Sequence, residues 1–253
     1  MSSARAATVW FIDTDDPASI LRAEAHNDFQ HARQVATAIF GDSVLVPLVD
    51  TDLATAASAK DTHVYAGFYG PLAVVSCSLF ETTAPSTLTR TLASIRRSAA
   101  TTLLYTEPET SLGVFARWEA GTLRRSFAAD PVTIHEDHGL PFTFEKPFWG
   151  GEYPLNYADG VPTAPMSLPF HPAQLAEEAN REWLGFRYTH PLAPSDVDPA
   201  RITVTCFALH PAEYEPTAAD YDNYREATAA RARTPRPEET PPKRGRIREY
   251  FGF

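Results

Sequence analysis

Runs of apolar residues separated by turn-forming residues predict a domain that is rich in β-strands. Residues 8–12 are apolar and favour a strand, which should end in a turn at the aspartates that follow. Similar runs recur at intervals along the chain. Further strands are expected at residues 44–49, 64–68, 72–79, 101–105, 132–135 and 202–209.

A hairpin is the clearest local signal. Residues 112–118 and 122–127 both have strand-like composition, and they flank the short connection Glu119-Ala120-Gly121. A short connection that contains glycine between two such runs is typical of an antiparallel hairpin.

Helical spacing of apolar residues predicts helices at residues 29–40, 85–97 and 172–185. In the last of these, Glu177 and Arg181 are one turn apart and are expected to pair. Several strands follow one another with no helix between them. The sequence therefore predicts an α+β fold with a mixed, largely antiparallel sheet and packed helices.

The chain is expected to divide into a globular domain, residues 1–211, and a flexible tail, residues 212–253. The tail should begin as a helix at residues 217–232, which opens with a capping box formed by Thr217 and Asp220. Residues 234–242 contain four prolines and cannot be helical.

Charge separates the same two parts of the chain. The formal net charge is −10, and residues 231–253 carry seven Lys or Arg against three Glu, which leaves −14 on residues 1–230. A body with this charge repels nucleic acid, so nucleic acid is an unexpected partner for it.

The remaining composition indicates an ordinary cytoplasmic protein. Cys77 and Cys206 lie far apart in apolar runs, where neither a disulfide framework nor a zinc site is expected. The longest uncharged stretch, residues 64–80, is too short and too interrupted to span a membrane. We expect no metal and no cofactor, and we find none of the common phosphate-loop, dinucleotide, nucleophile-elbow or zincin motifs.

Five segments together resemble an uncharacterised family of bacterial proteins, common in GC-rich Gram-positive bacteria and known only as a domain of unknown function. The resemblance covers roughly residues 8–210 and implies one domain in a cytoplasmic setting, with no functional residue to carry over. The segments that carry it are VWFIDTDDPASILR, VYAGFYGPLAVV, FARWEAGTLRRSFAADP, GLPFTFEKPFWGGEYP and LPFHPAQLAEEANREWLGF.

Two places in the body are candidate ligand sites. Asp13 and Asp15 follow a strand, where carboxylates often bind ligands, although turn formation and helix capping also explain aspartates there. Trp149 and Glu152 flank two glycines, so they form either a binding patch or an anchor that holds the long segment 131–169 on the core. The sequence His135-Glu136-Asp137-His138 has no metal-site spacing and is interpreted as a solvated acidic turn.

The tail contains the third candidate. It places basic residues directly before three aromatic residues, a combination found in docking peptides; the alternative is a tail that only improves solubility. The residues concerned are Arg244, Arg246, Tyr250, Phe251 and Phe253.

Two functions are consistent with these features. The first is a non-enzymatic module that binds a protein partner through the tail. The second is a hydrolase-like small-molecule enzyme with a site near the Asp13 turn and the Trp149 segment. The sequence leaves the choice between them, and the oligomeric state, open.

Overall fold

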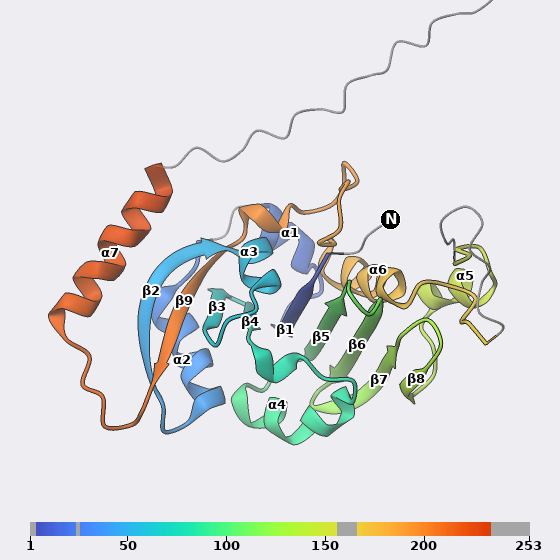
Figure 1. Ribbon diagram of the computed structural model, residues 1–253, viewed down its shortest axis with the longest axis horizontal. Helices are drawn as coiled ribbons and strands as arrows, with labels where there is room; N and C mark the ends of the chain where they lie inside the picture. Colours follow the sequence, from blue (N-terminus) through green and yellow to red (C-terminus); the bar gives the residue numbers. More distant parts are fainter. Residues whose placement is uncertain (1–3, 24–25, 156–165, 234–253) are drawn as a thin grey trace, which may run out of the picture.

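The structure is a computed structural model that describes residues 4–23, 26–155 and 166–233. Nine strands form one sheet in the order β2-β9-β3-β4-β1-β5-β6-β7-β8 (Figure 1). All eight neighbouring pairs are antiparallel. The strands are β1 (Ala6–Ile12), β2 (Val44–Asp52), β3 (Val64–Tyr69), β4 (Leu72–Ser76), β5 (Ala100–Glu107), β6 (Leu112–Glu119), β7 (Thr122–Ala129), β8 (Ile134–His138) and β9 (Thr203–His210).

Helices cover both faces of this sheet, so the expected α+β class with a largely antiparallel sheet is confirmed. The α-helices are α1 (Pro17–Arg22), α2 (Phe29–Phe40), α3 (Leu53–Ser58), α4 (Thr89–Ile95), α5 (Lys146–Trp149), α6 (Pro172–Leu184) and α7 (Ala218–Arg233). Short 3-10 turns are η1 (Ser78–Phe80), η2 (Pro85–Leu88), η3 (Thr143–Glu145) and η4 (Pro199–Arg201).

Two hydrophobic cores lie on opposite faces of the sheet. The first, which we call the α6-side core, contains residues of α1, α3, α5 and α6. The second, the α2-side core, contains residues of α2 and α4. In β1, Trp10 belongs to the first core and its neighbours Val9 and Phe11 to the second. Because successive side chains of a strand point to opposite faces, a strand buried on both faces has the continuous apolar sequence that β1 shows.

The predicted hairpin is confirmed by the antiparallel pairing of β6 with β7. Ala120 and Gly121 both have positive φ, 47° and 79°, as a two-residue hairpin turn requires. Trp118 is buried in the α2-side core, and its Nε1 donates a hydrogen bond to Thr89 Oγ1 at 2.9 Å.

Helix α6 begins at Pro172 and ends before Gly185 as expected, but the predicted pair of Glu177 with Arg181 is wrong. Arg181 binds Asp196, Nε to Oδ1 at 2.8 Å. Glu177 is buried and accepts hydrogen bonds from the backbone N–H groups of Tyr188 and Thr189. A carboxylate on the buried side of a helix is satisfied by the chain that packs there, and not by a neighbour on the exposed side.

The interpretation of residues 135–138 as a solvated turn is also wrong, because these residues belong to strand β8. Glu136 faces inward, where its carboxylate accepts hydrogen bonds from the hydroxyls of Ser86 and Ser126. Asp137 points to the opposite face and binds Arg125. Strand alternation therefore divides the acidic pair between two faces of the sheet.

Helix α7 confirms that the chain after residue 212 continues as a helix. Thr217 and Asp220 form the expected capping box, with Asp220 Oδ2 accepting from the N–H of Thr217 at 2.7 Å. The helix lies along β2, at the outer edge of the sheet (Figure 1). None of the described helices is long and apolar enough to cross a membrane.

Candidate functional site

An open cleft of about 660 Å³ lies at the end of the sheet where α4 meets the β6–β7 turn. Its size is within the range of small-molecule sites, roughly 300–1,000 Å³. The cleft is lined by Asp13, Thr89, Leu92, Ala93, Arg96, Arg97, Ser98, Thr101, Trp118, Ala120, Gly121 and Thr122.

One part of the cleft wall is apolar and the rest carries hydroxyl groups. Leu92, Ala93 and Trp118 form the apolar part. Ser98 Oγ donates to the carbonyl of Ala100 at 2.8 Å and lies 2.9 Å from Thr101 Oγ1. The wall therefore places apolar side chains, of which Ala93 is exposed and Leu92 and Trp118 are largely buried, beside oriented hydroxyls.

Asp13 fixes one side of the cleft through its carboxylate. Its Oδ2 accepts from Arg96 Nη2 at 2.9 Å, and its Oδ1 accepts from the backbone N–H of Ala99 at 2.8 Å. The Arg96 guanidinium also lies 5.0 Å from the centre of the Phe68 ring. Arg96 is thus positioned by an ion pair and a cation–π contact, and its charge is largely balanced by Asp13.

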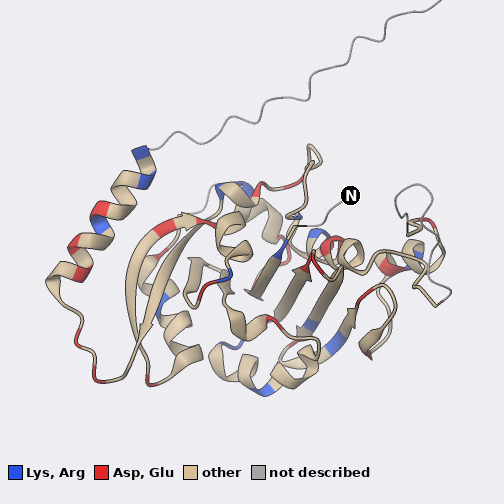
Figure 2. Ribbon diagram, in the orientation of Figure 1, with Lys and Arg blue, Asp and Glu red and all other residues tan. Residues whose placement is uncertain are grey.

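Arg97 has no such partner. Its side chain is exposed, and it forms no ion pair or hydrogen bond with any residue that the structure describes. The cleft therefore has two arginines against one carboxylate, a local excess of one positive charge in a body that carries −14. Figure 2 shows Lys and Arg positions on α4, after it, and on the nearby β6 and β7.

The structure separates the two sites that were expected in the body. Asp13 lines the cleft, whereas the neighbouring Asp15 is exposed and does not line it. The adjacent Asp16 caps α1 by accepting the N–H of Ser19 at 3.0 Å, as the turn interpretation predicted. Of these aspartates, only Asp13 is part of the cleft.

Trp149 lies elsewhere, at the edge of the α6-side core. Its ring makes edge-to-face contacts with Phe127 and Phe170, at centroid distances of 5.9 and 4.8 Å. Strand β7, which carries Phe127, is three strand spacings from β1, or about 14 Å. These contacts favour the anchor interpretation, although the ring remains 37% exposed. Glu152 is exposed in the turn after α5, away from Asp13.

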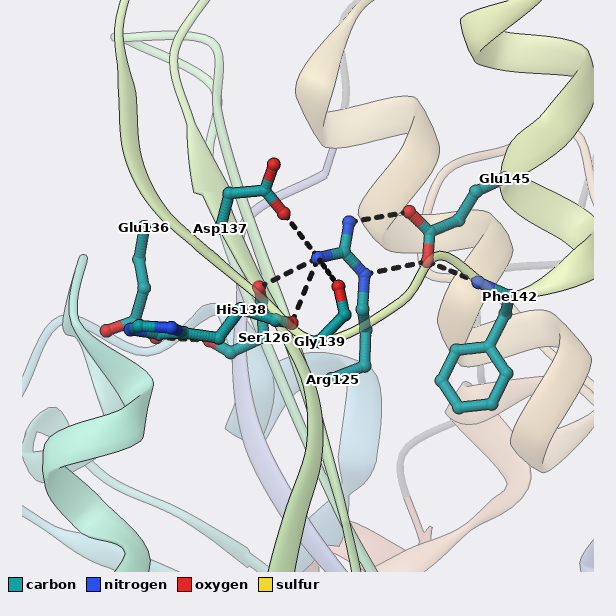
Figure 3. Close-up of polar contacts among 8 residues, drawn as sticks. All are labelled: Arg125, Ser126, Glu136, Asp137, His138, Gly139, Phe142 and Glu145. Carbon is teal, nitrogen blue, oxygen red and sulfur yellow. Dashed lines mark hydrogen bonds and ion pairs between the residues drawn. The ribbon is translucent and has the colours of Figure 1, made fainter.

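A buried arginine near β8 forms the densest polar network in the part of the chain that the structure describes (Figure 3). Arg125 donates to Glu145 through Nε and Nη2, at 3.0 and 2.8 Å, and through Nη1 to Asp137 and to the carbonyl of His138. Glu145 also accepts the N–H of Phe142 at 2.9 Å. Every nitrogen of the Arg125 guanidinium and both oxygens of the Glu145 carboxylate have a partner, so the network holds β7, β8 and η3 together.

A second group of titratable residues surrounds Asp61. Tyr65 Oη donates to Asp61 Oδ2 at 2.6 Å, and His63 Nδ1 lies 3.1 Å from the same oxygen. The crevice they line has no room for a water molecule. Burial raises the pKa of the nearby Cys77 thiol to about 12, so the thiol is not an activated nucleophile. We find no group of metal-ligating side chains among residues 4–23, 26–155 and 166–233.

The sequence interpretation found Asp13 but missed Arg96, Arg97 and Trp118. A signal existed, because two consecutive arginines lie in the short segment between a helix and a strand. Arginine outnumbers lysine 19 to 3 in this chain, which obscured that signal. The tail candidates Arg244, Arg246, Tyr250, Phe251 and Phe253 lie outside the described residues.

Comparison with known proteins places the chain in a family without assigning it an activity. No curated protein and no solved structure matches it. A family model described as a family of unknown function (DUF6928) matches residues 6–207, which include every strand up to β9 and the whole cleft. The chain therefore belongs to the DUF6928 family of unknown function.

Proposed function

We propose that this domain binds a small organic anion in the cleft between α4 and the β6–β7 turn. The observation that carries the proposal is Arg97, an exposed cation without an ion-pair partner among the described residues, at the rim of a cleft with an apolar wall. A guanidinium offers a planar set of donors that matches carboxylate and phosphate groups.

The walls suggest how such a ligand would lie. Its charged group would bind Arg97, and its apolar part would pack against Ala93, beside the largely buried Leu92 and Trp118. The hydroxyl protons of Ser98 and Thr101 are used by the Ala100 carbonyl and by Ser98 Oγ, so recognition of the anion would depend on the guanidinium of Arg97. Arg96 is held by Asp13 and would support the charge from one side.

The charge of the body favours a small ligand over a polymer. A polyanion such as nucleic acid would meet the −14 of the whole body, whereas a small anion meets only the cleft. Long-range repulsion therefore selects against the larger partner while the local excess of positive charge attracts the smaller one.

Binding is better supported than catalysis. Acid–base or nucleophilic catalysis needs a group within reach of the substrate whose protonation can change, commonly histidine, cysteine or a free carboxylate. The twelve residues that line the cleft include no histidine or cysteine, and the carboxylate of Asp13 is already ion-paired.

A thermal-shift series tests the proposal with the probes phenyl phosphate, benzoate, inorganic phosphate and the neutral benzyl alcohol. A ligand that binds only the folded state raises the melting temperature. We expect a rise with the two ring-containing anions and no rise with benzyl alcohol. The rise should disappear in Arg97→Gln and remain in the matched control Arg90→Gln, an exposed arginine of α4 that does not line the cleft. If benzyl alcohol and benzoate raised the melting temperature equally, the proposal that the cleft recognises the negative charge of its ligand would be contradicted.

A protein partner for the tail remains a separate proposal. It rests on the sequence of residues 243–253 alone, and it concerns a different part of the chain from the cleft.

A further inference from the structure

Three hydroxyl groups that line the cleft already donate their protons within the protein. Ser98 Oγ donates to the carbonyl of Ala100 at 2.8 Å, so the proton in its 2.9 Å contact with Thr101 Oγ1 comes from Thr101. Thr89 Oγ1 donates to the carbonyl of Ser86 at 2.8 Å. A hydroxyl has one proton to donate, so these three groups can offer a ligand only their acceptor lone pairs.

Two N–H groups of the cleft wall are used in the same way. Trp118 Nε1 donates to Thr89 Oγ1 at 2.9 Å. The backbone N–H of Ala120, in the β6–β7 turn, donates to the carbonyl of Ala99 at 2.9 Å. These donors are satisfied inside the protein, as buried polar groups generally are, and they are not available to a ligand.

Two exposed side chains of the cleft keep donors that a ligand can reach. They are the guanidinium of Arg97 and the hydroxyl of Thr122, and neither side chain forms a hydrogen bond with a residue that the structure describes. Arg96 contributes less, because its Nη2 donates to Asp13 and its Nε is buried. The donors available to a ligand are therefore concentrated on Arg97 and Thr122.

Asp13 is the charged acceptor of the cleft. Its side chain is 34% exposed, and each carboxylate oxygen accepts one hydrogen bond, Oδ1 from Ala99 at 2.8 Å and Oδ2 from Arg96 at 2.9 Å. A carboxylate has about four lone-pair positions, so about two remain open. Ser98, next to Ala99 in the chain, is partly exposed and keeps a lone pair after it accepts from Thr101. This side of the cleft consequently offers acceptors.

This division of donors and acceptors limits what a ligand can place in each part of the cleft. An anionic group fits the guanidinium of Arg97. A second anionic group beside Asp13 would meet a carboxylate, and like charges in contact reduce affinity. An apolar group there would remove water from the carboxylate without replacing its hydrogen bonds, which is also unfavourable. The part of the ligand beside Asp13 must therefore supply a proton.

We infer that the ligand of this cleft is a hydroxylated organic anion whose hydroxyl donates to Asp13, and that Asp13 determines this specificity. The inference rests on the proposed function, because it assigns a second contact to the ligand that Arg97 binds. An ammonium group would also supply a proton, but it would cancel the negative charge that two arginines against one carboxylate attract. A hydroxyl supplies the proton and leaves the charge of the ligand unchanged.

Isothermal titration into the full-length protein tests the inference with benzoates that differ at one ring position. The hydroxyl probes are meta- and para-hydroxybenzoate. The matched methoxybenzoates carry the same oxygen without a proton, and isophthalate and terephthalate carry a second carboxylate at the same positions. Benzoate itself is the reference, and it contacts Arg97 through the same carboxylate as the other probes.

The variant Asp13→Asn removes the charged acceptor and keeps a carbonyl oxygen that can accept from the N–H of Ala99. Its amide NH₂ is a donor, so it faces Arg96 without a hydrogen bond and no longer repels a second carboxylate. Asp15→Asn is the matched control, because Asp15 is an exposed aspartate of the same turn that does not line the cleft.

In the wild type, the better of the two hydroxybenzoates should bind about tenfold more tightly than benzoate, as expected for a hydrogen bond to a charged group. The methoxybenzoates and the two dicarboxylates should show no such gain. Asp13→Asn should still bind benzoate but lose most of the gain from the hydroxyl, and Asp15→Asn should keep it.

Equal wild-type affinities for benzoate and both hydroxybenzoates would overturn the inference, as would an undiminished hydroxyl gain in Asp13→Asn. In either case the proposed function stands if Arg97→Gln still loses benzoate binding. No binding of any of these probes to the wild type would overturn the proposed function and the inference together.

Discussion

Arg125 and Glu145 form a two-pronged ion pair in which neither side chain is exposed to solvent. Burial of two charges is costly, so removal of one partner leaves the other charge uncompensated in the interior. Glu145→Gln should therefore lower the free energy of unfolding by about 3–5 kcal/mol. Chemical denaturation measures this loss.

The exposed pair of Arg117 and Glu119 supplies the control, since Glu119 is half exposed. Glu119→Gln should change the free energy of unfolding by less than about 1 kcal/mol. Similar losses in both variants would show that the Arg125 network is not the structural clamp described above.

Glu177 gives the protein a pH-dependent stability. Burial raises the pKa of its carboxyl group from 4.5 to about 7, although the N–H groups of Tyr188 and Thr189 act in the opposite direction. Between pH 4.5 and about pH 7, the Glu177 carboxyl group of the folded protein keeps a proton that the same group of the unfolded chain has lost. The contribution of Glu177 to stability should therefore be greatest below pH 4.5 and fall until about pH 7, by on the order of 3 kcal/mol.

Comparison of Glu177→Gln with the wild type isolates this effect, because glutamine cannot titrate. The difference in free energy of unfolding between the two proteins should change across this pH range and remain constant above it. Glu178→Gln, on the partly exposed neighbouring residue, serves as the control. If the difference in free energy of unfolding between Glu177→Gln and the wild type did not vary between pH 4.5 and 7, the raised pKa of Glu177 would be refuted.

The sequence predicted the sheet more successfully than the site, for physical reasons. Strands buried on one or both faces, such as β1 and β6, have a hydrophobic pattern that follows directly from their burial. The hairpin was predictable because Gly121 supports a positive φ. Helix α3 was missed, since its six residues are too few to show a helical period.

Side-chain partners depend on contacts between distant segments, which no local pattern contains. Glu177 and Arg181 have the spacing of a helical ion pair, yet Arg181 binds Asp196 fifteen residues away. Likewise, the cleft combines Asp13, Arg97 and Trp118 from three separate elements. Their meeting is a consequence of the strand order β1-β5-β6, which the sequence alone did not reveal.

The C-terminal aromatic residues remain a prediction of the sequence. If Tyr250, Phe251 and Phe253 are apolar anchors for a protein partner, their replacement by alanine should lower recovery of that partner without changing the melting temperature of the body. The basic residues Arg244 and Arg246 should make this recovery weaker at higher salt. Equal recovery by the triple alanine variant would show that the tail does not take part in binding.

Isothermal titration of phenyl phosphate into the full-length protein tests the proposed anion site most directly. Hydrogen bonds to a charged group contribute about 1.5–3 kcal/mol, so Arg97→Gln should weaken binding at least about tenfold. Arg90→Gln should bind as the wild type does, because this arginine does not line the cleft. Equal affinities of the wild type and Arg97→Gln, or no binding of phenyl phosphate and benzoate by the wild type, would contradict the assignment of the cleft as an anion-binding site.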